Sequence, residues 1–90
     1  MNEPTIPQVA RWMMDELVRV GCLYQEVAAA EIKRRFGSQF VLVNPNGNLA
    51  LDRQVLKEFH TLTGDSVVWE LGERCWRGRE GYDPPGRQAD

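Results

Sequence analysis

The 90-residue sequence lacks the features that identify metalloproteins, membrane proteins and secreted disulfide scaffolds. It has two cysteines and one histidine, too few for a four-ligand structural zinc site without carboxylates. No C-x-x-C pair occurs, and no apolar run approaches the ~20 residues that a membrane span needs. The first residues carry neither the basic region nor the apolar region of a signal peptide. We therefore expect a cytoplasmic protein with reduced thiols and with no metal or cofactor.

An excess of basic residues is also missing. The 11 Lys and Arg residues stand against 13 Asp and Glu residues, a net charge of −2. Proteins dedicated to nucleic-acid binding usually carry a basic excess or a strong basic patch, so only a local patch would support that class. The chain is 42% hydrophobic and 27% charged, which is ordinary for a globular protein. Its length favours one domain with a modest core.

Turn-forming residues divide the chain into five segments and a tail. Amphipathic periodicity predicts a first helix from near Thr5, where a capping box starts, to Gly21. A second helix is predicted over about 25–36 and a third over about 53–63, because each apolar stripe is followed by a glycine.

The segment between the second and third helices predicts a β-hairpin over 40–51. Pro45 suits the second position of a type I turn, and Gly47 is expected to adopt a positive φ. The segment Ser66 to Arg79 predicts a fourth helix. As one strand it would mix Glu70 with Trp76 on one face, whereas the helical period collects its apolar residues on one arc.

These elements predict an α+β fold of order α-α-β-β-α-α. We expect a single small domain over 5–79, with four helices packed around one β-hairpin, partly reminiscent of a winged helix. Residues 80–90 contain Pro84-Pro85-Gly86 and almost no apolar side chain, so they predict a mobile C-terminal tail.

No motif for catalysis or cofactor binding is present. The sequence has no G-x-G-x-x-G, no P-loop and no H-E-x-x-H. A catalytic pair of Cys22 or Cys75 with His60 is conceivable, but Cys75 lies on the apolar arc of the predicted last helix. Free cysteines are among the most often buried residues, so we expect buried thiols and a protein that is not an enzyme.

Three tryptophans are a high number for a small domain. In the predicted last helix Trp69, Gly72 and Trp76 share one face, and Gly72 would let another element approach closely. Trp12 falls on the charged side of the first helix. The face of Trp69 and Trp76 is either core or a protein-contact surface, and the sequence leaves both open. With Trp12 it forms the candidate protein-contact surface of an interaction module, or of a homodimer.

A basic cluster, Lys33, Arg34 and Arg35, supports an alternative function. Two helices followed by a hairpin could act as a winged-helix-like nucleic-acid-binding module that uses this cluster and the hairpin. Cations at the end of a helix also stabilise its C-terminus, which explains the cluster without any partner. We therefore rank a protein partner or self-association above nucleic acid, and we expect no membrane partner.

A series of short motifs runs over residues 9–79. It comprises Arg11-Trp12-Met13, Gly21-Cys22-Leu23-Tyr24-Gln25, Phe36-Gly37, Asn46-Gly47-Asn48-Leu49-Ala50, Val55-Leu56-Lys57, Phe59, Leu62-Thr63, Val67-Val68-Trp69-Glu70 and Cys75-Trp76-Arg77. Together these motifs resemble a family of small bacterial proteins of unknown function, members of which occur on mobile elements, including integron gene cassettes. The resemblance implies a bacterial accessory gene product. It names no activity, so it assigns no catalytic residue.

Overall fold

The computed structural model describes residues 3–80 and 88–89 of the chain. These residues form an α+β domain with three α-helices, one short 3-10 helix and two sheets. In chain order the elements are α1 (Ile6–Val20), β1 (Cys22–Tyr24), α2 (Gln25–Phe36), η1 (Ser38–Phe40), β2 (Val41–Val43), β3 (Leu49–Leu51), α3 (Arg53–Thr63), β4 (Val67–Glu70), β5 (Cys75–Gly78) and β6 (Gln88–Ala89). One sheet has the strand order β1-β5-β4-β6, and the other is the hairpin β2–β3.

Helix α1 begins as the sequence predicts. The Gln8 backbone N–H donates to the Thr5 hydroxyl at 3.3 Å, and the Thr5 N–H donates to the Gln8 side chain at 2.9 Å. This capping box satisfies two of the N–H groups that a helix start leaves without a partner. The buried face of α1 packs most extensively against α3, and its buried residues are Val9, Ala10, Met13 and Leu17.

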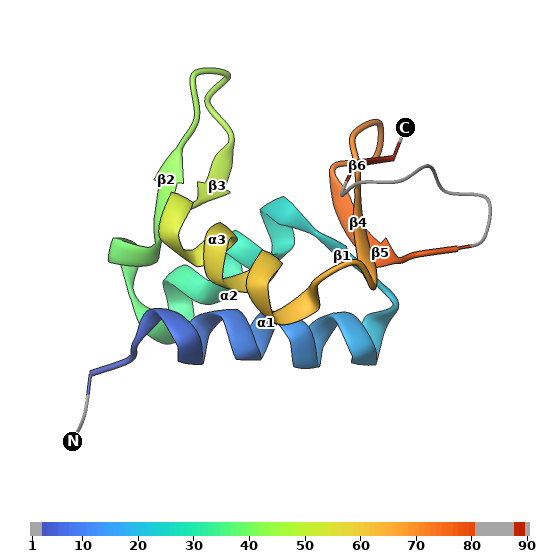
Figure 1. Ribbon diagram of the computed structural model, residues 1–90. Helices are drawn as coiled ribbons and strands as arrows, with labels where there is room; N and C mark the ends of the chain where they lie inside the picture. The colour runs from blue at the N-terminus through green and yellow to red at the C-terminus, as the bar shows by residue number, and fades with distance from the viewer. Residues whose placement is uncertain (1–2, 81–87, 90) are drawn as a thin grey trace.

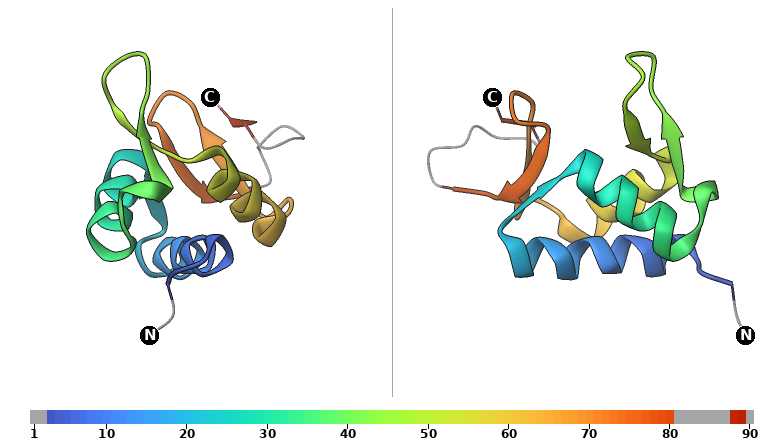
Figure 2. Two further views of the ribbon diagram at one scale, coloured as in Figure 1. Left: turned by 90° about the vertical axis from the view of Figure 1, so that its left-hand side faces the viewer. Right: turned by 180° about the vertical axis from the view of Figure 1, so that it is seen from behind.

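The three helices form the body of the domain, and the two sheets lie at its ends (Figure 1). Seen from the front and from behind, the hairpins β2–β3 and β4–β5 both rise on the side away from α1 (Figure 2). The core joins the helices to the sheet of β1, because buried residues of α1, α2 and α3 meet Leu23 and Trp76. The hairpin β2–β3 is anchored mainly through contacts of β3 with α2.

The predicted fourth helix over Ser66–Arg79 is wrong, because this segment forms the antiparallel hairpin β4–β5. Trp69 lies directly opposite Trp76 in the strand register. The chain reverses over residues 71–74, where Arg74 adopts a φ of 57° and its N–H donates to the Glu70 carbonyl at 2.8 Å. The predicted order with four helices around one hairpin is therefore corrected to α-β-α-β-β-α-β-β through Gly78.

A partner strand from elsewhere in the chain explains this correction. Residues Cys22–Tyr24, which lie between the first two predicted helices, form β1 and pair with β5, which places Leu23 opposite Trp76. Glu70 accepts from Arg77 at 2.8 Å across the hairpin. Cross-strand pairs of this kind stabilise sheets. The hydrophobic periodicity of a single segment gives no sign of them.

The two glycines that the sequence singles out have different outcomes. Gly47 has a φ of +82° in the turn between β2 and β3, and its N–H donates to the Asn44 carbonyl at 2.9 Å. This confirms the predicted conformation, which β-branched residues adopt only with strain. Gly72 lies exposed in the β4–β5 turn, with no atom within 4 Å of the place of a Cβ. No other element of the described part of the chain packs against Gly72, and its contact with a second chain stays a prediction.

Most of the predicted tail, residues 81–87 and 90, lies outside the described residues. The mobility expected for residues 80–90 thus stays a prediction. Within that stretch, β6 runs parallel to β4, with Gln88 opposite Trp69 and Ala89 opposite Glu70.

Candidate functional site

The structure separates the residues of the candidate protein-contact surface. Trp12 is partly buried between α1 and α2, where its ring meets Phe36 edge-on at a centroid distance of 6.1 Å. The Arg35 guanidinium lies 5.6 Å from the centre of the Trp12 ring, in cation–π geometry. Trp12 therefore packs two helices together rather than standing free on a polar face.

Trp69 and Trp76 contact each other within the hairpin β4–β5, with ring centroids 4.8 Å apart and ring planes tilted by 53°. Trp76 is only 3% exposed and also contacts Phe59 edge-on at 5.4 Å. Trp69 is partly buried and packs against the same core. The structure thus places Trp76 in the core, whereas Gly72 lies in the exposed turn and Trp12 between two helices.

Two of the three cations in the basic cluster at the end of α2 share one acidic partner. Glu31 accepts from Arg34 at 2.8 Å and from Arg35 at 2.9 Å. Hydrogen bonds from these two guanidinium groups lower the pKa of Glu31 to about 2. Only Lys33 of the cluster has no ion-pair partner within the described residues. The geometry favours the interpretation in which these cations complete the helix C-terminus.

A more distinctive surface is the hairpin β2–β3 with its flanking residues, which we name the uncharged hairpin (residues 36–51). No Asp, Glu, Lys, Arg or His occurs among these residues, although 27% of the whole chain is charged. Leu42 is 43% exposed and Val43 is 67% exposed on β2. Within the described residues, β2 pairs only with β3, so its outer edge has no strand partner. The sequence analysis predicts the hairpin but does not use its lack of charged residues, although the sequence alone shows that lack.

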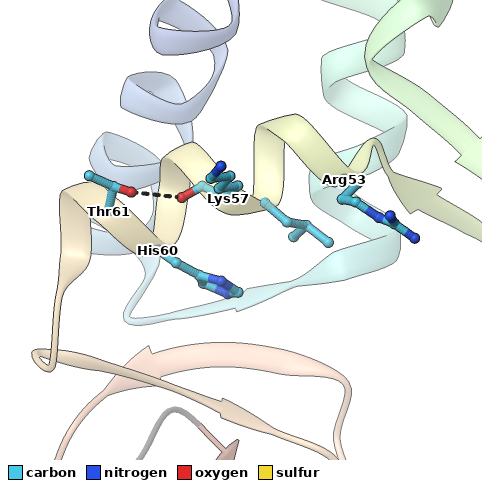
Figure 3. A pocket seen from close by; sticks show the side chains of 5 residues that line it. Arg53, Lys57, His60 and Thr61 are labelled. Carbon is cyan, nitrogen blue, oxygen red and sulfur yellow. Dashed lines mark hydrogen bonds between the residues drawn. The ribbon is translucent and has the colours of Figure 1, made fainter.

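The outer face of α3 forms a shallow depression. It is lined by Arg53, Leu56, Lys57, His60 and Thr61, and Figure 3 shows four of these labelled along the helix. The Thr61 hydroxyl donates to the Lys57 carbonyl at 3.0 Å. Neither Arg53 nor Lys57 has an ion-pair partner among residues 3–80 and 88–89. Sequence reasoning did not single out these two cations, which lie one helical turn apart.

The two cysteines lie beside each other on adjacent strands. Cys22 on β1 and Cys75 on β5 have their Sγ atoms 2.8 Å apart. His60 lines the depression on α3 (Figure 3). Among the described residues, no group of three or more His, Cys, Asp or Glu side chains could hold a metal ion.

Among the comparisons with known proteins, the one with protein families gives a match. No curated protein and no solved structure shows a significant similarity to the chain. No helix within residues 3–80 and 88–89 is both long and apolar enough to cross a membrane. Residues 5–78 match a protein family described as "Family of unknown function (DUF6953)", so the chain belongs to this family of unknown function.

Proposed function

We propose that the protein is a small, non-enzymatic interaction module that pairs with a second copy of itself through the outer edge of β2. The observation that supports this proposal is the uncharged hairpin, residues 36–51, with exposed aliphatic side chains on an unpaired edge. The origin that the sequence resemblance implies, a bacterial accessory gene product carried on a mobile element, is compatible with such a role and stays a prediction.

The edge of β2 lacks the usual protection against strand pairing. Natural proteins place Lys, Pro, bulges or inward-pointing charges on edge strands, because an open edge offers unpaired N–H and C=O groups to any other strand. Residues Val41–Val43 carry none of these devices. A two-stranded sheet is also marginal by itself, so a third and a fourth strand would stabilise it.

The sequence of β2 favours a second copy as the partner. Val41-Leu42-Val43 reads the same in both directions. An antiparallel pair of identical strands around a twofold axis at Leu42 therefore places Leu42 opposite its own copy and Val41 opposite Val43. Like pairs of aliphatic side chains then meet on both faces, as cross-strand packing prefers.

We expect Leu42→Lys to abolish self-association and to leave the domain folded. A lysine at the centre of the paired edge would bring two like charges together across the twofold axis. Sedimentation velocity at protein concentrations up to about 1 mM should show wild-type mass rising towards twice the chain mass. The variant should stay at the monomer mass with an unchanged circular dichroism spectrum.

The matched control is Val18→Lys, because Val18 is the most exposed large aliphatic side chain, at 83%, and lies on α1. This variant should dimerise like the wild type. In a background of Cys22→Ser and Cys75→Ser, Leu42→Cys should give a covalent dimer under mild oxidation. A wild type that stays monomeric throughout, or a Val18→Lys variant as monomeric as Leu42→Lys, would contradict the proposed interface.

Nucleic-acid binding is a second candidate function. The structure favours the outer face of α3, rather than the end of α2, as the surface that would bind. With β2–β3 set aside as an insertion, the order α1-β1-α2-α3-β4-β5 and the strand order β1-β5-β4 are those of a winged helix. In that arrangement α3 takes the place of the reading helix and β4–β5 that of the wing. Arg53 and Lys57 would then face a phosphate backbone.

For this candidate we expect Arg53→Ala and Lys57→Ala each to reduce the slope of log affinity against log salt by about 1. Fluorescence anisotropy of a labelled DNA duplex over a series of salt concentrations, starting at low salt, measures this slope. Lys33→Ala is the control, since Lys33 lies on α2 and should leave the slope unchanged. Absence of binding at about 50 mM salt would exclude this function, because non-specific affinity is greatest there.

A further inference from the structure

Two nucleophilic side chains, Cys22 and Cys75, are in direct contact. Cys22 lies on β1 and Cys75 on the adjacent strand β5, and Tyr24 rather than Cys22 stands directly opposite Cys75. The two cysteines are thus diagonal neighbours on one face of the sheet. Their Sγ atoms are 2.8 Å apart, only about 0.8 Å more than a disulfide bond length.

The two thiols differ in their access to solvent. Cys75 is fully buried, whereas Cys22 is partly exposed. Burial, together with the hydrogen bond from Cys22, raises the pKa of the Cys75 thiol to about 12. A dissolved reagent therefore reaches Cys22 first, and Cys75 is protected from direct reaction with solvent species.

The residues around the pair form a defined environment. Tyr24 stands directly opposite Cys75 in the strand register, and the Cys22 and Cys75 thiols raise the pKa of its phenol. Arg77 stands opposite Cys22 in the register, and its guanidinium donates to Glu70 at 2.8 Å. Cys22 therefore sits at the end of β1 beside polar groups, whereas Cys75 lies on a strand paired on both sides.

We propose that Cys22 and Cys75 are a modification site that forms a reversible intramolecular disulfide with a low-molecular-weight disulfide as oxidant. Cys22 attacks the small disulfide, which breaks its S–S bond, forms a mixed disulfide on Cys22 and releases one small thiol that takes the Cys22 proton. Cys75 then attacks the Cys22 sulfur, which forms the Cys22–Cys75 bond and releases the second small thiol with the Cys75 proton. The two protein thiols are oxidised, and one small disulfide is reduced to two thiols.

The new bond would fasten the edge strand β1 to the hairpin β4–β5. The two cysteines are 53 positions apart in the chain, so the bond closes a long loop and restricts the unfolded state. We expect the oxidised protein to have a Tm higher than the reduced protein by roughly 10 °C. The bond needs only a small closing movement, because the sulfur atoms already touch and β1 has three residues.

The test is intact-mass spectrometry of the folded full chain after incubation with oxidised glutathione. The wild type should lose about 2 Da, the mass of two hydrogens, and retain no glutathione. Cys75→Ser should retain one glutathionyl group, because the resolving thiol is gone. Cys22→Ser should remain unmodified, because Cys75 is buried. Dithiothreitol should reverse the first two changes.

Several outcomes would overturn the proposal. These are a wild type that carries stable glutathionyl groups, a Cys22→Ser variant that reacts as fast as Cys75→Ser, and a wild type that loses 2 Da only in denaturant. Circular dichroism of each variant shows whether it is folded. If either serine variant is unfolded, the wild-type mass change and the Tm shift of the native protein still decide the question.

Discussion

Replacing Trp76 by alanine is expected to lower the free energy of unfolding by about 3–5 kcal/mol, the range for large aromatic truncations in cores. Trp76 is 3% exposed and contacts two aromatic rings, Trp69 at 4.8 Å and Phe59 at 5.4 Å. A 90-residue domain has a total stability of about 5–13 kcal/mol, so the loss is a large part of it. Urea unfolding followed by circular dichroism measures the change.

The other two tryptophans provide matched comparisons for Trp76→Ala. Trp69→Ala and Trp12→Ala remove partly buried rings at the edge of the core, so each should cost less than Trp76→Ala. An equal cost for Trp69 and Trp76 is what a shared helical face would give. That result would contradict the structure, in which Trp76 is only 3% exposed and contacts Phe59, whereas Trp69 is partly buried.

The helices and the first hairpin could be predicted because their signals are local. Thr5 and Gln8 form the capping box, Asp52 caps α3 by accepting from the Gln54 N–H at 2.9 Å, and Gly47 has the positive φ that its turn needs. Each feature depends on residues within about four positions of one another. A sequence pattern contains all the information that such features require.

The hairpin β4–β5 could not be predicted in the same way, because its stability depends on β1. Three residues, Cys22–Tyr24, are too short to show a strand period, and they pair with residues more than 50 positions away. The alternation expected of one continuous strand also fails over the whole segment. The turn at residues 71–74 reverses the chain, so that Trp69 and Trp76 face the same side although seven positions separate them.

The candidate site was affected by the same error. Trp69, Gly72 and Trp76 share a face only in a helix that does not form. In the structure Trp76 lies in the core, Trp69 lies beside it and is partly buried, and Gly72 lies in an exposed turn. Two residues of the basic cluster share a partner, since Glu31 precedes Arg34 and Arg35 by three and four positions and pairs with both. Helical spacing could have revealed that pairing from the sequence. A role of the cluster in nucleic-acid binding stays a prediction.

Phe59→Ala is expected to be as destabilising as Trp76→Ala, with a loss of about 3–5 kcal/mol. Phe59 is fully buried on α3, in the same core cluster as the buried face of α1, and it meets Trp76 of the sheet edge-on at 5.4 Å. Removing it leaves a cavity where the helices and the sheet join. Leu62→Ala is the control on the same helix, because Leu62 is 37% exposed and should cost far less.

The double variant Phe59→Ala, Trp76→Ala shows whether the helices and the sheet share one core. An edge-to-face aromatic pair contributes about 0.5–1.5 kcal/mol beyond its buried area, so the two losses should not add. We expect the free energy of unfolding of the double variant to exceed the additive value by about 0.5–1.5 kcal/mol. The measurement uses stabilising conditions, such as added sulfate, so that each variant stays folded. Strict additivity would mean that α3 and the sheet are held independently. The β4–β5 hairpin would then depend on β1 alone, and Leu23→Ala should remove it without disturbing the packing of α1 against α3.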